Sequence, residues 1–246
     1  MSEALVIRTD SEGRTTLTLN RPTKLNALNP AVFIQLRAHL DAIAKDPSVG
    51  VVVLAGAGRS FCAGHDLDAI ASHEPAPSPY FEPETIDALE QLPKPTICRI
   101  QGHCFTGGLE LALACDLLVA AESTKLGDTH GQWGLVPVWG MSVRLPERVG
   151  RARAKELMYT SRRLNAREAC DLGLVDHCVP DEQLDARIDA LCQEILANSR
   201  GTNRIVKALI ADRDTRSRPD ALVHERLRPY GRPEDMGERM KAGGRR

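Results

Sequence analysis

Residues 102–116 read GHCFTGGLELALACD, a glycine turn followed by an apolar segment with helical character. The apolar run just before it, PTICRI at 95–100, has the composition of a strand. The sequence therefore predicts a strand, a turn at Gly107 and Gly108, and then a helix. The start of a helix leaves backbone N–H groups without intrahelical partners and carries partial positive charge. Such a turn can stabilise a developing oxyanion.

Glu110 is the one carboxylate inside the apolar segment 107–115. Carboxylates are rarely buried unless they are paired or take part in chemistry. Two interpretations are open from this stretch alone. Glu110 either complements the positive start of the helix, or it works as an acid or base beside the free N–H groups.

The composition is that of an ordinary soluble globular protein, with 246 residues, 42% apolar residues, 26% charged residues and a formal net charge of −1. This near-neutral charge creates no general field for nucleic acid or membranes. Aromatic residues make up 4%, which disfavours a stacking platform for single-stranded nucleic acid. The sequence shows neither a membrane-spanning apolar run nor a signal peptide, so we expect a cytoplasmic protein.

The seven cysteines are odd in number and form no C-x-x-C pair, so neither a disulfide framework nor a structural zinc site is expected. The histidines also lack recognisable ligand spacing, and we expect no metal. The sequence contains no dinucleotide fingerprint after a strand and no G-x-S-x-G elbow.

The chain is expected to open with a β-hairpin, then a helix over 30–45 that Asn29 caps and Pro30 begins. Apolar runs predict further strands at 49–54, 95–100, 117–121 and 174–178. The proline-rich segment 70–85 is predicted to be a mobile loop, and 125–139 an irregular one. Asp181 is predicted to cap a helix that ends near residue 197.

The composition shifts near residue 195 from mixed strands and helices to charged helices alone. We place a domain boundary there, which separates a core, 1–195, from a helical region, 196–246.

Together these pieces resemble the crotonase superfamily, the enoyl-CoA hydratases and isomerases. Each motif is weak alone, but their order and spacing make a strong signal over most of the chain. The matching positions are 20–22, 26–28, 61–64, Asp66, Leu67, Lys94, Pro95, Gly102, Gly107, Gly108, Glu110, Ala112, Cys115, Asp116, Gly134, Pro137, Gly140, Arg144, Leu145, Gly150, Ala154, Ala166, Ala169 and 173–175.

The resemblance implies an α/β (α+β) fold, in which repeated β-β-α turns form a spiral core and the C-terminal helices pack between subunits. It implies a homotrimer or a dimer of trimers. It implies an acyl-CoA thioester as the ligand, so coenzyme A enters as part of the substrate and no separate cofactor is expected.

The resemblance also assigns the site. It implies that the backbone N–H groups of His65 and Gly107 hold the thioester oxygen, and that Glu110 is the first catalytic glutamate. The residues expected to contact the substrate are Lys24, Asn26, Ala63, His65, Asp66, Leu67, Asp68, Gly107, Gly108, Trp133 and Pro137.

The chain departs from the family at the second catalytic glutamate, where it carries His130. A histidine has a reference pKa near 6.5 and can also carry a proton near neutrality. His130 therefore either replaces the second acid–base group or only lines the pocket and donates hydrogen bonds. Asp128, two residues earlier, is a third candidate.

Four functions are compatible with this pattern. We favour a 2-enoyl-CoA hydratase, in which Glu110 and His130 or Asp128 add water across the double bond. An enoyl-CoA isomerase needs only Glu110 to move a proton. An acyl-CoA-binding paralogue with little turnover and an acyl-CoA hydrolase, which would use a different carboxylate pair, are the other two.

Overall fold

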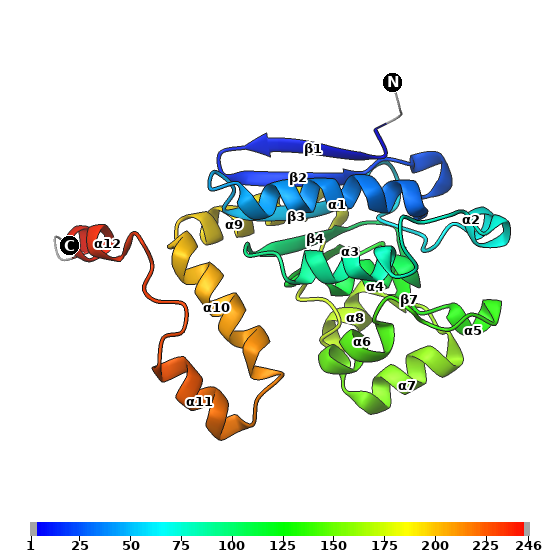
Figure 1. Cartoon of the computed structure of the whole chain (residues 1–246). Helices are drawn as coiled ribbons and strands as arrows, with labels where there is room; N and C mark the ends of the chain where they lie inside the picture. Colours follow the sequence, from blue (N-terminus) through cyan, green and yellow to red (C-terminus); the bar gives the residue numbers. More distant parts are fainter. Residues whose placement is uncertain (1–3, 244–246) are drawn as a thin grey trace.

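The structure is a computed structural model that describes residues 4–243, and it consists of two sheets with helices around them (Figure 1). The larger sheet has the order β1-β2-β3-β4-β6-β9, with β1 and β2 antiparallel and the other pairs parallel. Its strands are β1 Val6–Ser11, β2 Arg14–Leu19, β3 Val51–Gly56, β4 Thr96–Ile100, β6 Leu117–Ala121 and β9 His177–Val179. The smaller sheet has the order β5-β7-β8, with β5 His103–Phe105, β7 Lys125–Gly127 and β8 Leu164–Asn165.

The helices are η1 Pro22–Lys24, α1 Pro30–Lys45, α2 Leu67–Ser72, α3 Phe81–Glu90, α4 Gly107–Leu113, α5 His130–Trp133, α6 Met141–Val149, α7 Arg151–Thr160, α8 Ala166–Asp171, η2 Asp181–Gln183, α9 Leu184–Leu196, α10 Arg200–Arg213, α11 Arg218–Arg226 and α12 Met236–Gly243. Two consecutive strands precede α1, α4 and α5, as expected of β-β-α repeats, whereas β3 alone precedes α2.

Every residue of β3 is buried, because helices cover both faces of the large sheet. Val52 and Leu54 point into a core shared with α1 and α4, whereas Val51 and Val53 pack against α9. Successive side chains of a strand point to opposite faces. A continuous apolar run, rather than an alternating one, is therefore what this position requires.

The predicted hairpin and first helix are confirmed. β1 and β2 pair along their whole length, and α1 begins at Pro30 as expected. The Asn29 side chain accepts a hydrogen bond from the Val32 N–H at 3.1 Å, which satisfies one of the free donors at the helix start.

Three local predictions need correction. The predicted loop over 70–85 is shorter and covers only 73–80: α2 extends to Ser72, and α3 already begins at Phe81, because Pro83 falls in its first turn, where the missing N–H costs nothing. The segment 125–139 contains β7 and α5. Asp181 caps no helix, since its carboxylate accepts hydrogen bonds from the backbone and side chain of Ser123.

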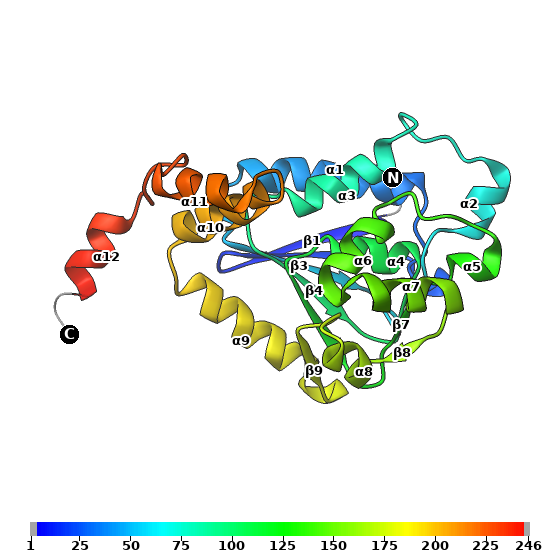
Figure 2. The same cartoon turned by 90° about the horizontal axis from the view of Figure 1, so that it is seen from below.

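The last three helices extend away from the sheets, with α12 farthest out (Figures 1 and 2). α10 contacts the body of the protein through long cationic side chains. The Lys207 ammonium lies 2.8 Å from the Asp116 carboxylate, and Arg200 donates to the carbonyls of Pro47 and Ser48. The boundary placed near residue 195 stays a prediction. Within residues 4–243, none of the helices has both the length and the apolar character needed to span a bilayer.

Candidate active site

A cavity of about 730 Å³ lies between η1, the loop after β3, the start of α4 and the segment around α5. Its walls are mostly apolar, and a few polar groups converge on it, as in most small-molecule sites. The lining residues are Lys24, Ala27, Ala63, His65, Asp66, Leu67, Asp68, Ile70, Thr106, Gly107, Glu110, Thr129, His130, Trp133, Gly134, Leu135, Val136, Val138 and Trp139.

Two backbone turns meet at one end of this cavity. A Cβ built on Gly107 would lie 3.3 Å from the His65 nitrogen, and a Cβ built on Gly64 would lie 3.5 Å from the Gly107 nitrogen. The carbonyl of Gly64 accepts from Leu28 and the amide of Thr106 donates to Gly127, so both turns are held by their neighbours.

The amides of His65 and Gly107 are available to a ligand. Across residues 4–243, neither N–H has an acceptor within the protein. Gly107 is the first residue of α4, so its N–H has no partner inside the helix. The structure therefore brings together the two donors that the sequence predicted, next to each other and free.

Glu110 is 1% exposed and lies one turn into α4. Its Oε1 accepts hydrogen bonds from the backbone N–H groups of Trp139 and Met141, each at 3.0 Å. Burial raises the pKa of Glu110 above its ordinary value, and the two backbone hydrogen bonds and the charge of His130 limit that rise. The hydrogen bonds of Glu110 thus come from a segment outside its own helix, and its side chain lines the cavity.

His130 stands between two carboxylates. Its Nδ1 lies 2.5 Å from Asp128 Oδ1, and its Nε2 lies 3.7 Å from Glu110 Oε2. Burial lowers the pKa of His130, but the hydrogen bond to Asp128 and the charges of both carboxylates outweigh it, so the pKa is raised overall. Asp128 thus fixes the ring and leaves Nε2 directed toward Glu110.

A pair of threonines holds the His130 segment against the start of α4. Thr106 Oγ1 and Thr129 Oγ1 lie 2.5 Å apart, and the Thr129 N–H also donates to Thr106 Oγ1 at 3.3 Å. Thr106 has a φ of +51°, a conformation that is uncommon outside glycine. Sequence reasoning missed this pair, because it forms only when two distant segments meet.

The aromatic wall of the cavity is centred on Trp139. Its ring lies 4.6 Å from the His65 ring and 4.9 Å from the Phe33 ring, centroid to centroid. Burial lowers the pKa of His65, with the charge of His130 acting in the same direction, so this imidazole is neutral at pH 7. His65 therefore offers a backbone donor to the site and a neutral ring to its wall.

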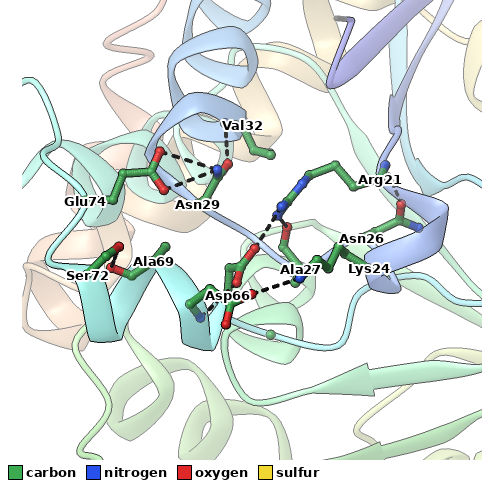
Figure 3. A network of polar contacts seen from close by, with 12 residues as sticks. Arg21, Lys24, Asn26, Ala27, Asn29, Val32, Asp66, Ala69, Ser72 and Glu74 are labelled. Atoms are coloured by element: carbon green, nitrogen blue, oxygen red, sulfur yellow. Dashed lines mark hydrogen bonds and ion pairs between the residues drawn. The ribbon is translucent and has the colours of Figure 1, made fainter.

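Two of the predicted contact residues near the cavity mouth, Asp66 and Asp68, form ion pairs. The Arg21 guanidinium lies 2.8 Å from the Asp66 carboxylate and also donates to the Ala27 carbonyl (Figure 3). Lys24 lies 2.8 Å from Asp68, and both side chains are exposed. These residues line or adjoin the mouth, where a polar end of a ligand would enter.

Three of the expected contact residues lie outside the cavity lining. The buried Asn26 side chain donates to the carbonyls of Ala57 and Ser60 and accepts from Arg21, so it holds the loop together. Gly108 faces Cys62 so closely that a Cβ would lie 2.5 Å from the Cys62 carbonyl oxygen. Pro137 stands between two lining residues, Val136 and Val138.

No group of three or more histidine, cysteine, aspartate or glutamate side chains within residues 4–243 is arranged to hold a metal ion.

A family model described as enoyl-CoA hydratase/isomerase matches residues 9–229. The chain belongs to the enoyl-CoA hydratase/isomerase family. It is 37% identical over 213 residues to "Probable enoyl-CoA hydratase 1, peroxisomal" of Arabidopsis thaliana, covering 86% of this chain and 80% of that protein. It is 33% identical over 241 residues to the 1,2-epoxyphenylacetyl-CoA isomerase of Escherichia coli, covering 94% and 92%.

Solved structures of the family show the same fold. An enoyl-CoA hydratase from Bacillus anthracis matches with a TM-score of 0.92 at 32% identity, over 98% of this chain and 96% of that one. A candidate enoyl-CoA hydratase from Thermobifida fusca, solved with acetoacetyl-CoA, matches with a TM-score of 0.84 at 28% identity, over 91% and 92%. The predicted superfamily and its α/β fold are confirmed.

We expect Asp128→Asn to lower the pKa of His130, because the substitution removes the negative charge that raises it and replaces a charged acceptor with a weaker, neutral amide oxygen. A histidine whose folded pKa is raised stabilises the fold below its unfolded pKa, and this contribution is lost as the pH rises through the folded pKa. The variant should therefore lose more free energy of unfolding at about pH 5.5 than at about pH 9. NMR titration of His130 and denaturation at both pH values measure this.

Asp181→Asn is the matched control, since that carboxylate binds Ser123 on the surface. It should leave the pKa of His130 unchanged. A His130 titration that is the same in Asp128→Asn and in the wild type would contradict the pairing.

Proposed function

We propose that this protein is an enoyl-CoA hydratase that adds water to a 2-enoyl-CoA thioester. The observation that carries the proposal is the placement of two proton carriers: Glu110 Oε2 lies 3.7 Å from His130 Nε2. Both side chains line the cavity that also receives the free amides of His65 and Gly107. One group that accepts a proton and one that donates it are what the addition of water requires.

The paired amides supply the electrostatic part of the reaction. Addition at the β carbon of an enoyl thioester places negative charge on the thioester oxygen. Fixed N–H dipoles stabilise that charge without having to reorient, and each such donor contributes about 3 kcal/mol in other enzymes. In this chain the donors belong to His65 and Gly107, so they are set by the backbone and not by a side chain.

Each of the two side chains favours the ionised form of the other: the charge of His130 opposes the rise in the pKa of Glu110, and the charge of Glu110 helps to raise the pKa of His130. Glu110, even with a raised pKa, is the base that takes a proton from water, and His130, with its pKa raised, is the acid that protonates the α carbon. After one turnover the proton lies on Glu110 and His130 is neutral. A separation of 3.7 Å is too long for a hydrogen bond, but one water at about 2.8 Å from both atoms can return the proton.

The acyl-CoA assignment is supported by the relative solved with acetoacetyl-CoA. We place the thioester between the two amides and the acyl group against the wall formed by His65 and Trp139. The CoA portion then leaves the cavity at its polar mouth, beside Lys24, Asp66 and Asp68. Leu67 and Trp133, which are 45% and 59% exposed, lie at the same opening.

An enoyl-CoA isomerase is the second candidate. It is favoured by the family itself, whose model is described as enoyl-CoA hydratase/isomerase. In that reaction Glu110 alone would take a proton from one carbon and return it to another, and His130 would only help to hold the carboxylate.

The C-terminal helices support the trimer, or dimer of trimers, proposed for the quaternary structure. α10 to α12 expose large apolar side chains that a single chain leaves uncovered. They include Val206, Ile210, Val223, Leu227 and Met240. Apolar surface of this kind marks an interaction site in soluble proteins, and 196–246 would then be the region that joins subunits.

We expect Glu110→Gln to slow the hydration of crotonyl-CoA by about 10²- to 10⁴-fold, because it removes the proton acceptor and keeps the shape. The loss of the conjugated enoyl absorbance measures the rate, and calorimetry measures the retained binding of the thioester. Glu156→Gln, on the exposed face of α7, is the control and should keep the wild-type rate. A fast Glu110→Gln variant would remove this residue from the mechanism.

His130→Gln separates the two candidate reactions. An acid works only while protonated, so wild-type hydration should decline as the pH rises through the raised pKa of His130, and this limb should vanish in the variant. Hydration by His130→Gln should fall about 10²- to 10⁴-fold, with the limb absent from the residual rate, whereas conversion of a 3-enoyl-CoA by Glu110 alone would persist in an isomerase. Tight thioester binding without turnover of either substrate by the wild type would indicate a binding protein instead.

Gly107→Ala tests the oxyanion site. The added Cβ would lie 2.4 Å from Trp139 Cζ3 and 3.3 Å from the His65 nitrogen, so the ring or the turn must move. We expect hydration to fall about 10²- to 10³-fold, as for the loss of one oxyanion donor. Gly237→Ala in α12 is the control, because a Cβ there meets no described atom within 4 Å. Wild-type rates in Gly107→Ala would contradict this role.

A further inference from the structure

Arg144, on α6, is a buried cation that lies outside the cavity lining. It is 7% exposed, and three neighbours share its guanidinium. Nε and Nη2 donate to the two oxygens of Glu90 at 2.9 and 2.6 Å, and Nη2 also donates to Asp87 at 2.6 Å. The remaining nitrogen, Nη1, donates to the backbone carbonyl of Trp139 at 2.8 Å. The two carboxylates belong to α3, so Arg144 ties α3 to the turn that precedes α6.

That turn, formed by residues 139–141, is also the one that binds the carboxylate of Glu110. The N–H groups on either side of Gly140, those of Trp139 and Met141, both donate to Glu110 Oε1. The peptide plane between Trp139 and Gly140 lies between these two donating planes. Fixing its carbonyl therefore limits the orientation of both donors.

The turn has a conformation that needs support. Gly140 has a φ of +108°, in the region that favours glycine. A Cβ built on Gly140 would lie 2.1 Å from Arg144 Nη1, so the guanidinium fills the space beside the turn. Arg144 makes no contact with the cavity itself, and its influence on Glu110 passes through the backbone.

We propose that Arg144 is a positioning residue, which holds the Trp139 carbonyl and thereby presents the Trp139 and Met141 N–H groups to Glu110. The inference rests on the proposed function insofar as Glu110 is the base. Arginine suits this place because its planar fork reaches two carboxylates and a carbonyl at once, which the single ammonium of lysine does not. The anchor is α3, through Asp87 and Glu90.

Arg144→Lys is the first test, because it keeps the charge and removes the fork. We expect kcat for crotonyl-CoA to fall about ten- to a hundredfold with little change in KM, as for a displaced catalytic group. Because the backbone hydrogen bonds to the ionised form of Glu110 become weaker, its pKa should rise. The acidic limb of the rate profile should therefore move to higher pH. A purely structural ion pair would lower the thermal stability and leave this limb in place.

Arg148→Lys is the matched control on the same helix. Arg148 donates to the carbonyls of Cys115 and Asp116 and pairs with Asp176, away from the turn. The Arg148→Lys variant should keep the acidic limb of the rate profile at its wild-type pH. Should Arg144→Lys fail to fold, the double variant Asp87→Asn, Glu90→Gln loosens the same anchor with isosteric side chains and should shift the limb in the same direction.

The ¹³C carboxylate titration of Glu110, assigned by the signal missing from Glu110→Gln, gives a readout without turnover. A higher midpoint in Arg144→Lys or in the double variant supports the positioning role. A folded variant with the wild-type midpoint and limb overturns it. If instead the wild type has no hydratase activity, or Glu110→Gln remains active, the proposed function fails while this titration still decides the role of Arg144.

Discussion

The site depends on a backbone ladder that joins the loop after β3 to β5. Phe61 donates to Gln101, Cys62 donates to His103, and Phe105 donates back to Cys62. These hydrogen bonds fix the register between two segments about forty residues apart. The next residues of each segment are the turns at Gly64 and Gly107, so the ladder sets how closely their amides approach. The proposed oxyanion site therefore needs no particular side chain, only the space that the two glycines leave.

The burial of Glu110 beside that site is a second constraint on the fold, and it costs free energy of solvation. A buried carboxylate loses its hydration, and the protein must replace it with hydrogen bonds or charge. For Glu110 the replacement comes from the 139–141 turn and from His130. Both lie C-terminal to α4, so the chain must return to the cavity before Glu110 is stable there. This explains why the segment after β7 is packed against the start of α4 and is not a free surface loop.

Much of the fold could be predicted because its signals are local. Asn29 and Pro30 mark the start of α1, and the all-apolar β3 indicates a strand covered on both faces. The short strands β5 and β8 were missed, since two or three residues carry no periodicity and exist only through pairing. Asp181 matched a cap pattern, yet Ser123 competes for its carboxylate from 58 residues away.

The candidate site also has some features that could be predicted from local sequence and others that could not. Glu110, His65 and Gly107 follow from motifs within short stretches, and the structure brings them together. The orientation of His130 does not follow from such a stretch, because it is set by Asp128 on one side and Glu110 on the other. Asn26 fits a family motif but does not line the cavity. Its side-chain amide instead donates hydrogen bonds to the backbone carbonyls of Ala57 and Ser60 in another loop.

A histidine at the second acid–base position changes how the site holds its charge. Two glutamates facing each other would repel when both are ionised, so one of them would have to keep a proton. Glu110 and His130 attract each other when both are charged, and Asp128 adds to the attraction on the cation. This attraction favours the state in which Glu110 is ionised and His130 is protonated. In the proposed hydration, water gives its proton to the anion and the α carbon takes one from the cation. The neutral pair that results returns to the charged state by one proton transfer.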